Sequence, residues 1–269
     1  MAISKEDKSR FNEASKDDKA NLIKYEKLIK EISDKKKKHP SISAYYSLEL
    51  ADTYLKMIPI YLHISDLSND IMGIKDSASQ EKARKAYSNL LIMLEEVVGS
   101  DFDRPLSENK DYLMKIEKFN IRQTLELMKK MIFVYDTLVD NFGSDSKHKW
   151  HFVDNHAKIA NLIKNFINFA TIEQFRNFRS EFYRDREDLL NLCKRTLEEA
   201  AKNIRNKYEL STQAPEDIKK AIWLLSSLRQ INVIYGESEE AEKNKTVIDA
   251  LRQRFEQEEK KKEEAKKKR

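Results

Sequence analysis

The amino-acid sequence predicts an all-α protein, folded as an elongated helical bundle. The first observation is that 269 residues contain only four Gly and four Pro, where average usage gives about nineteen and about thirteen. The second is that apolar residues recur at helical spacing while 36% of all residues are charged, which suits helices with one buried face. The third is that all four Gly and three of the four Pro fall at expected helix ends.

The first third of the sequence predicts three helices after a flexible N-terminus at residues 1–14. These helices are expected at about 15–38, 43–64 and 78–98. Pro59 lies inside the second of them, and proline removes a backbone hydrogen bond and clashes with the preceding turn. We therefore expect a kink or an early helix end near Met57.

A long helix at about 111–142 is expected to be the spine of the bundle. These 32 residues contain no Gly or Pro, and one continuous helix of that length is about 48 Å long. Apolar residues repeat in it every seven positions, at Met114, Ile121, Met128, Tyr135 and Phe142. Further apolar residues complete a heptad seam and widen it, at Leu125, Met131, Ile132, Leu138 and Val139. A face this wide favours several intrachain neighbours over a dimeric coiled coil.

The second half of the sequence predicts another long helix. A helix at about 152–169 precedes it, and Thr171 with Gln174 has the spacing of a capping box. We expect these two residues to open a helix at about 172–208. Two shorter helices are expected after it, from Pro215 to about Gly236 and from Ser238 to Phe255.

Helix pairs at a fixed period would indicate a repeat fold instead of a bundle. The helices expected at 43–64 and 78–98 have a spacing of about 35 residues, like a tetratricopeptide unit. The later helices are too long for that period, so a divergent helical-repeat solenoid is kept as the alternative. Residues 15–255 are expected to form one helical domain, with a division near 100–110 as an alternative, before a charged, helical or disordered tail at 256–269.

The positive charge of the sequence lies at its two ends. Residues 1–39 contain twelve Lys and Arg against eight Asp and Glu, and residues 252–269 contain nine against five. Basic ends can contact nucleic acid or an anionic membrane surface, but the interleaved Glu residues weaken both contacts. We therefore expect neither partner. No apolar run reaches the roughly 18 residues of a transmembrane helix.

One region of the sequence combines Phe and Arg side chains. On the helix expected after Thr171, three Phe rings lie at positions i, i+3 and i+7, with Arg residues between and after them. Aromatic and Arg side chains are enriched at protein interfaces, and the alternative is an apolar core with solvated Arg residues over the rings. The interface candidates are Phe175, Phe178, Arg179, Phe182 and Arg186.

The histidine cluster offers a weaker hypothesis. His148, His151 and Asp154 lie three residues apart, and on one helical face they would offer two nitrogen ligands and one oxygen ligand to zinc. Their spacing matches no established zinc motif. The alternative is a polar helix start whose Trp150 and Phe152 anchor the core.

The remaining patterns favour an interaction protein over an enzyme. The sequence contains no phosphate-binding loop, dinucleotide fingerprint or nucleophile elbow, and Cys193 is expected in the core. We therefore expect no catalytic residue and no cofactor. The sequence predicts a non-enzymatic scaffold protein that binds other proteins, or copies of itself, as a subunit of a larger assembly.

Two alternatives to the scaffold prediction stay open. One is an adaptor that binds nucleic acid or an anionic surface through its basic ends, and the other is a helical-bundle metal protein. The N-terminus lacks the apolar core of a signal peptide. A cytoplasmic location is the default expectation, and a cell-envelope location would require a signal that is not in this sequence.

Overall fold

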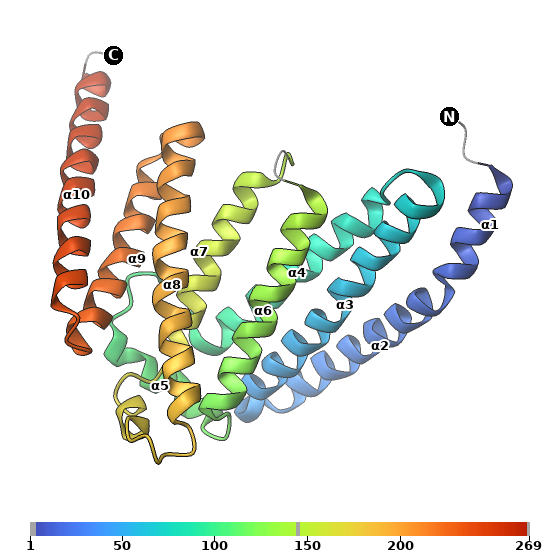
Figure 1. Ribbon diagram of the computed structural model, residues 1–269, viewed down its shortest axis with the longest axis horizontal. Helices are drawn as coiled ribbons and strands as arrows, with labels where there is room; N and C mark the ends of the chain where they lie inside the picture. Colours follow the sequence, from blue (N-terminus) through green and yellow to red (C-terminus); the bar gives the residue numbers. More distant parts are fainter. Residues whose placement is uncertain (1–3, 144–145, 268–269) are drawn as a thin grey trace. The chain divides into compact units, whose positions relative to one another are not determined.

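The computed structural model describes residues 4–143 and 146–267, with side chains as far as residue 260. Every regular element in these ranges is helical, which confirms the predicted all-α fold (Figure 1). The chain divides into two compact units. Unit 1 consists of residues 1–99 and 114–146, and unit 2 consists of residues 100–113 and 147–269.

Unit 1 is built around one helix, α3. Its helices are α1 (Lys5–Ala14), α2 (Lys16–Lys38), α3 (Ser43–Met72), α4 (Ser77–Val98) and α6 (Ile121–Phe142). The other four helices all contact α3, and α4 contacts it over the greatest length (Figure 1). Ala51 and Ile58 of α3 are fully buried as a result. Because α3 lies at the centre of unit 1, it buries side chains on more than one face.

The predicted early end of α3 near Met57 is wrong. The helix continues through Pro59 to Met72, and it ends where Gly73 adopts φ 70°. The N–H of Gly73 donates to the Asn69 carbonyl at 2.8 Å, which caps the last turn in the left-handed conformation that glycine favours. Pro59 still costs α3 one backbone hydrogen bond, but packing against several helices offsets that cost.

The predicted continuous helix at 111–142 is also wrong, because α6 begins only at Ile121. The preceding residues form the short helix α5 (Asn109–Leu113) and a 3-10 turn, η3 (Met114–Ile116). Asn120 and Gln123 form a capping box that fixes the start of α6. The Asn120 side chain accepts from the Gln123 N–H at 3.0 Å, and the Gln123 side chain accepts from the Asn120 N–H at 2.9 Å.

The heptad seam of α6 is only partly the face that the helix buries. Met114 lies before α6 and is 62% exposed, and Ile132 and Val139 are half-buried. Met131 and Leu138, which were expected only to widen the seam, are fully buried. The buried face is therefore shifted around the helix towards the side that contacts α3 and α4.

Replacing Asn120 with alanine (Asn120→Ala) is expected to lower the free energy of unfolding by about 1 kcal/mol, because it removes the side-chain oxygen that accepts from the Gln123 N–H. Urea unfolding followed by circular dichroism measures the change. Asn12→Ala is the control, since Asn12 is exposed within α1 and its side chain accepts from Lys19 Nζ at the surface. An equal loss in both variants would contradict the capping role of Asn120.

Unit 2 is a series of helices in which each contacts the next. Its main helices are α7 (Lys149–Asn165), α8 (Tyr183–Lys207), α9 (Pro215–Ile234) and α10 (Ser238–Lys267). α7 packs against α8, α8 against α9, and α9 against α10 (Figure 1). A π-helical turn, η5 (Tyr208–Thr212), follows α8 directly. No helix in the described part of the chain combines the length and apolarity needed to cross a membrane.

The predicted long helix at 172–208 is divided into a loop and α8. The chain makes successive turns after α7, including the 3-10 turn η4 (Ile172–Phe175), and α8 begins at Tyr183. The side chain of Thr171 makes no capping hydrogen bond. The Phe175 and Phe182 rings meet edge to face, with centroids 5.4 Å apart. On a straight helix, seven residues would separate them by about 10 Å along the axis, so their contact requires the loop.

A segment from earlier in the chain completes unit 2. Residues 100–113, called the strap, include η2 (Leu106–Glu108) and α5. Asn161 and Lys164 of α7 donate to the carbonyls of Ser100 and Phe102, both at 3.1 Å. Asn109 donates in return to the carbonyls of Lys164 and Ile167, at 2.9 and 3.2 Å. The Lys164 carbonyl lies in the last turn of α7 and the Ile167 carbonyl just after it, where a helix leaves acceptors for groups from outside.

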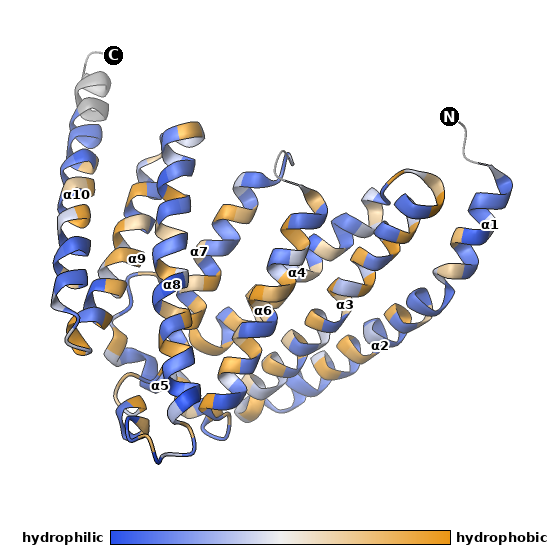
Figure 2. Cartoon of the chain, viewed as in Figure 1, coloured by the Kyte–Doolittle hydropathy of each residue, from blue (hydrophilic) through white to orange (hydrophobic). Residues whose placement is uncertain are grey.

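The two ends of the chain are helical but contribute little to the core. Residues expected to be flexible form α1, whose N-cap Ser4 accepts from the Asp7 N–H at 2.9 Å, yet α1 buries no residue. At the other end, the backbone of α10 is helical to Lys267. Hydrophilic residues dominate α10 (Figure 2), and its buried side chains are Ala241, Ile248 and Leu251.

Candidate functional site

A cleft of about 320 Å³ lies in unit 2, between the loop before α8, the first turns of α8 and the end of α9. Its cationic lining residues are Arg176, Arg186 and Lys194, and its carboxylates are Glu187 and Glu237. Two tyrosines, Tyr183 and Tyr235, line it as well. The loop lies beside the start of α8 (Figure 1, yellow), so local turns bring Arg176 to the same cleft as residues of α8.

Arg186 is the buried centre of this cleft. Its side chain is 5% exposed, and its two terminal nitrogens pair with the carboxylates of Glu173 and Glu187. Its guanidinium carbon lies 5.2 Å from the centroid of the Tyr235 ring. These contacts fix the guanidinium against both the loop and the end of α9, because a buried charge needs partners on each side.

Two hydrogen-bond donors of the cleft have no acceptor within the described part of the chain. They are the Nε–H of Arg186 and the hydroxyl of Tyr235, both buried. Burial, followed by the nearby Glu173 carboxylate, raises the pKa of Tyr235 to about 12. The phenol therefore keeps its proton at neutral pH. Its hydroxyl is near Glu173 and Arg186 but forms a hydrogen bond of acceptable geometry with neither.

The remaining charged side chains of the cleft differ in how closely they are paired and in how exposed they are. Lys194 of α8 is paired with Glu237 at 2.5 Å, and its side chain is 22% exposed. Arg176 of the loop is 79% exposed and lies 3.9 Å from Glu173. Arg176 is therefore the charge at the mouth of the cleft that is most open to solvent.

Three exposed apolar side chains belong to the segments that form this cleft, and we call them the apolar rim. Ile234 lines the cleft and is 50% exposed, Val233 precedes it in α9 and is 57% exposed, and Phe178 lies two residues after Arg176 in the loop and is 74% exposed. Among the described residues of unit 2, the remaining exposed large hydrophobic side chain is Leu210. Exposed apolar side chains gathered at one place are characteristic of binding surfaces.

A comparison with models of protein families identifies the family of this sequence. The model of the TP0443 family matches residues 7–259, which is most of the chain. The chain belongs to the TP0443 family. No curated protein and no solved structure matches this TP0443-family protein, so its cleft is interpreted from its own geometry.

The five predicted interface residues do not lie on one helix, because four of them belong to the loop before α8 and only Arg186 belongs to α8. Phe178 and Arg179 of this TP0443-family protein are exposed, with the Arg179 guanidinium 5.4 Å from the centroid of the Phe178 ring. Phe175 and Phe182 contact each other and stabilise the loop. Arg186 is buried in the cleft. The helical spacing on which the interface prediction relied is absent, and the interface itself stays a prediction.

Sequence reasoning did not find the other wall of the cleft. Tyr235 and Glu237 lie about fifty residues after Arg186, and Lys194 lies two turns along α8 from it. No local pattern marks these residues as neighbours. Only the packing of α8 against α9 brings them together.

The three residues of the zinc hypothesis do not form a ligand group in the TP0443-family protein. No three His, Cys, Asp or Glu side chains are grouped to hold a metal ion in residues 4–143 or 146–260. His151 Nε2 lies 3.3 Å from the Asn155 amide. Asp154 binds Lys207 Nζ through both carboxylate oxygens, at 2.8 and 2.9 Å. This geometry gives the zinc hypothesis no support.

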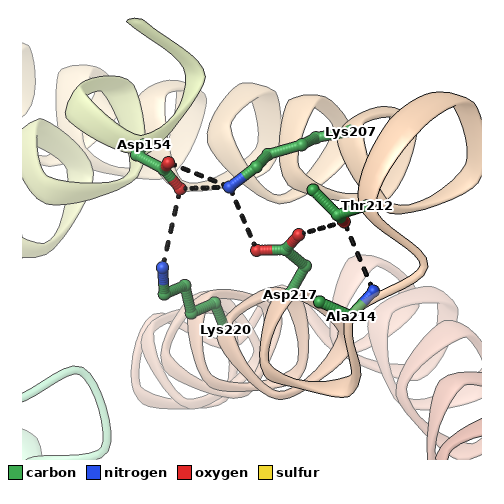
Figure 3. A network of polar contacts seen from close by, with 6 residues as sticks. All are labelled: Asp154, Lys207, Thr212, Ala214, Asp217 and Lys220. Atoms are coloured by element: carbon green, nitrogen blue, oxygen red, sulfur yellow. Dashed lines mark hydrogen bonds and ion pairs between the residues drawn. The ribbon is translucent and has the colours of Figure 1, made fainter. Parts of the chain in front are cut away.

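Asp154 instead belongs to a network that joins α7, α8 and α9 (Figure 3). Lys207 Nζ also contacts Asp217 at 3.3 Å, and Lys220 contacts Asp154 at 3.5 Å. The hydroxyl of Thr212 donates to Asp217 at 2.6 Å. The network holds the π-helical turn η5 against α9, so its role is to stabilise the packing of these elements.

Lys164 and Cys193 are buried ionisable side chains of unit 2 that lie outside both the cleft and the Lys207 network. Lys164 is 1% exposed, and burial lowers its pKa to about 8. Cys193 is fully buried, and burial raises the pKa of its thiol to about 12. Lysines with lowered pKa values occur in catalytic sites. Lys164, however, donates to the Phe102 carbonyl of the strap, and the neutral thiol of Cys193 is a poor nucleophile.

Proposed function

We propose that this TP0443-family protein is a non-enzymatic scaffold protein that binds other proteins, as a subunit of a larger assembly, through its cleft and apolar rim. The observation that carries the proposal is the exposure of Phe178, which is 74% exposed and lies two residues after Arg176 of the cleft lining. Burying such a ring in a partner contributes about 2 kcal/mol. Aromatic and Arg side chains are also the ones in which binding energy concentrates.

The composition of the cleft supports a protein partner over nucleic acid. Its three cationic residues share the lining with Glu187 and Glu237, and Glu173 lies behind Arg186. A surface that follows a phosphate backbone carries mainly positive charge. A balanced polar cleft with an apolar rim has instead the anatomy of a protein interface.

Affinity capture with two matched variants tests the proposal. Phe178→Ala is expected to abolish capture of protein partners from native extract, because it removes the most exposed ring of the loop that supplies Arg176 to the cleft. Phe133→Ala is the control, since Phe133 of α6 is 70% exposed but belongs to unit 1. Both changes are at exposed positions and are expected to alter stability by no more than about 0.5 kcal/mol.

Quantitative mass spectrometry of the captured proteins gives the result. Partners retained by wild type and Phe133→Ala but lost from Phe178→Ala support the proposal. Partners retained equally by all three baits, or no captured protein at all, would contradict it.

A further inference from the structure

We infer that the strap couples the two units, so that unit 1 and unit 2 unfold in one cooperative step. This coupling is a property of the whole chain, and it holds whether or not the cleft of unit 2 binds a protein. It follows from the order in which the chain enters the two units, and from the contacts that fix the strap at both of its ends and in its middle.

The chain crosses between the two units three times. It leaves unit 1 after residue 99, returns at residue 114 and leaves again after residue 146. Each unit is therefore built from two segments of the sequence, and a segment of the other unit separates them. Domains joined by a single crossing are able to fold and unfold independently. The interleaved order of this chain links the folding of each unit to that of the other.

Both ends of the strap are fixed in unit 1. Val97 and Val98, the last residues of α4, lie just before the strap and are fully buried. After the strap, η3 packs against α3, and Ile116 of η3 is 2% exposed. The Lys118 N–H then donates to the hydroxyl of Tyr45 in α3 at 3.0 Å. Folded unit 1 therefore holds the two ends of the strap at a fixed separation.

The middle of the strap is fixed in unit 2. Its hydrogen bonds to α7 and to the turn after α7 involve the side chains of Asn109, Asn161 and Lys164. These three residues are at most 2% exposed. Separating the strap from α7 would take away partners from polar groups that the fold has removed from water, which is unfavourable. Folded unit 2 therefore requires the strap.

Chain entropy makes each half-unfolded state unfavourable. With unit 1 folded and unit 2 unfolded, residues 100–113 would be a disordered loop whose ends unit 1 still holds. With unit 2 folded and unit 1 unfolded, residues 114–146 would be a disordered loop whose ends unit 2 still holds. Closing a disordered loop costs entropy, and the fully folded chain contains neither loop. Both half-unfolded states are therefore disfavoured relative to the folded and the unfolded chain.

Cooperative unfolding extends the effect of binding from one unit to the other. A ligand stabilises the folded state of the protein region that it contacts. Because neither unit unfolds alone, a molecule that binds unit 2 stabilises unit 1 as well.

The two tryptophans of the sequence provide a probe of unit 2 alone. Trp150 and Trp223 both belong to unit 2, whereas far-ultraviolet circular dichroism follows the helices of both units. Urea unfolding of the full-length protein is therefore followed by tryptophan fluorescence and by circular dichroism. Ile58→Val removes one carbon from the core of unit 1, and we expect it to lower the urea midpoint of both signals equally, by roughly 0.4 M.

Ile58→Ala is expected to give a larger shift, again equal in the two signals, and Ile58→Val decides the question if the alanine variant does not fold. A fluorescence midpoint that keeps its wild-type value while the circular dichroism curve shifts or becomes biphasic would overturn the inference. Fluorescence and circular dichroism curves that do not coincide in the wild type would overturn it as well.

Strap variants test whether the strap carries the coupling. Asn109→Ala combined with Asn161→Ala removes hydrogen bonds between the strap and unit 2. In this background, Ile58→Val is expected to shift the fluorescence midpoint by less than it does in the wild type. Asn109→Ala alone is used if the double variant does not fold.

Asn203→Ala is the matched control for the strap variants. Asn203 of α8 contacts His156 of α7 at 3.1 Å, and both residues lie outside the strap. In this background, Ile58→Val is expected to shift the fluorescence midpoint by as much as in the wild type. Equal shifts in the strap background and the Asn203→Ala background would contradict the role assigned to the strap.

Discussion

Replacing Lys207 with methionine (Lys207→Met) is expected to lower the free energy of unfolding by about 3 kcal/mol. The Lys207 side chain is 10% exposed and binds the carboxylates of Asp154 and Asp217 (Figure 3). Burial alone would lower the pKa of Lys207, but these two carboxylates outweigh burial and raise it. The network is therefore intact at neutral pH. Methionine fills a similar volume, so the expected loss comes from two carboxylates that keep their charge without their shared cation.

The expected loss is at the low end of the range for buried ion pairs. Asp154 is 33% exposed and keeps Lys220 at 3.5 Å, so water and a second lysine partly replace the missing ammonium. Asp217 is 5% exposed and keeps only the Thr212 hydroxyl at 2.6 Å. Most of the lost stability is therefore expected to arise at Asp217.

Lys243→Met is the matched control for Lys207→Met. Lys243 also contacts two carboxylates, those of Glu239 and Glu240, at 3.0 and 2.8 Å. It is fully exposed to solvent on α10, where water screens ion pairs. Urea unfolding is expected to show no measurable change for Lys243→Met. Similar losses in the two variants would contradict the role assigned to burial.

The difference in stability between wild type and Lys164→Met is expected to shift by about 2 kcal/mol in favour of wild type as pH rises from about 7.5 to about 9.5. Burial lowers the pKa of Lys164 from 10.5 to about 8. Between these values the unfolded chain binds a proton that the folded chain does not. Raising the pH therefore removes a penalty that acts on the folded state, and stability rises.

Urea unfolding of both proteins at several pH values measures this effect. The comparison with Lys164→Met is needed because Cys193 acts in the opposite direction. Its pKa is raised to about 12 in the folded chain, so the unfolded thiol loses its proton first and stability falls above about pH 9. That contribution is present in both proteins but cancels only in part, because Lys164 itself lowers the pKa of the Cys193 thiol. A difference that does not depend on pH would show that Lys164 is not desolvated.

The sequence was sufficient where a local signal coincided with a helix end. The helix expected at 78–98 is α4, which ends at Val98 before Gly99. Pro215 begins α9. Proline is favoured there because the first turn of a helix does not use the backbone N–H that proline lacks. The signals that decide these ends lie within a few residues, so they can be read without knowing the tertiary fold.

The predictions of two long helices were wrong for a different reason. Apolar spacing continued through the stretch before Ile121, but the capping box of Asn120 and Gln123 was the stronger signal and was readable in the sequence. At Thr171 the reverse happened, since a capping-box spacing was present but its hydrogen bond is not made. A pattern shows that a cap is available, and only tertiary contacts decide whether it is used.

The candidate site was predictable by composition and not by geometry. Phe178 and Arg179 could be selected because aromatic and Arg side chains are enriched at interfaces. The exposure of Phe178 and the burial of Arg186 could not be derived, because both depend on a loop that replaces the expected helix. Tyr235 could not be found at all, since its proximity to Arg186 follows from helix packing.

Because the strap precedes the last part of unit 1 in the sequence, it leaves the ribosome before the rest of unit 2. Ribosomes release the N-terminal residues first, and domains begin to fold as they emerge. Residues 100–113 therefore emerge before α7, to which Asn109 and the Phe102 carbonyl are bound in the finished structure. The nascent chain thus holds an unfinished piece of unit 2 while residues 114–146 are still completing unit 1.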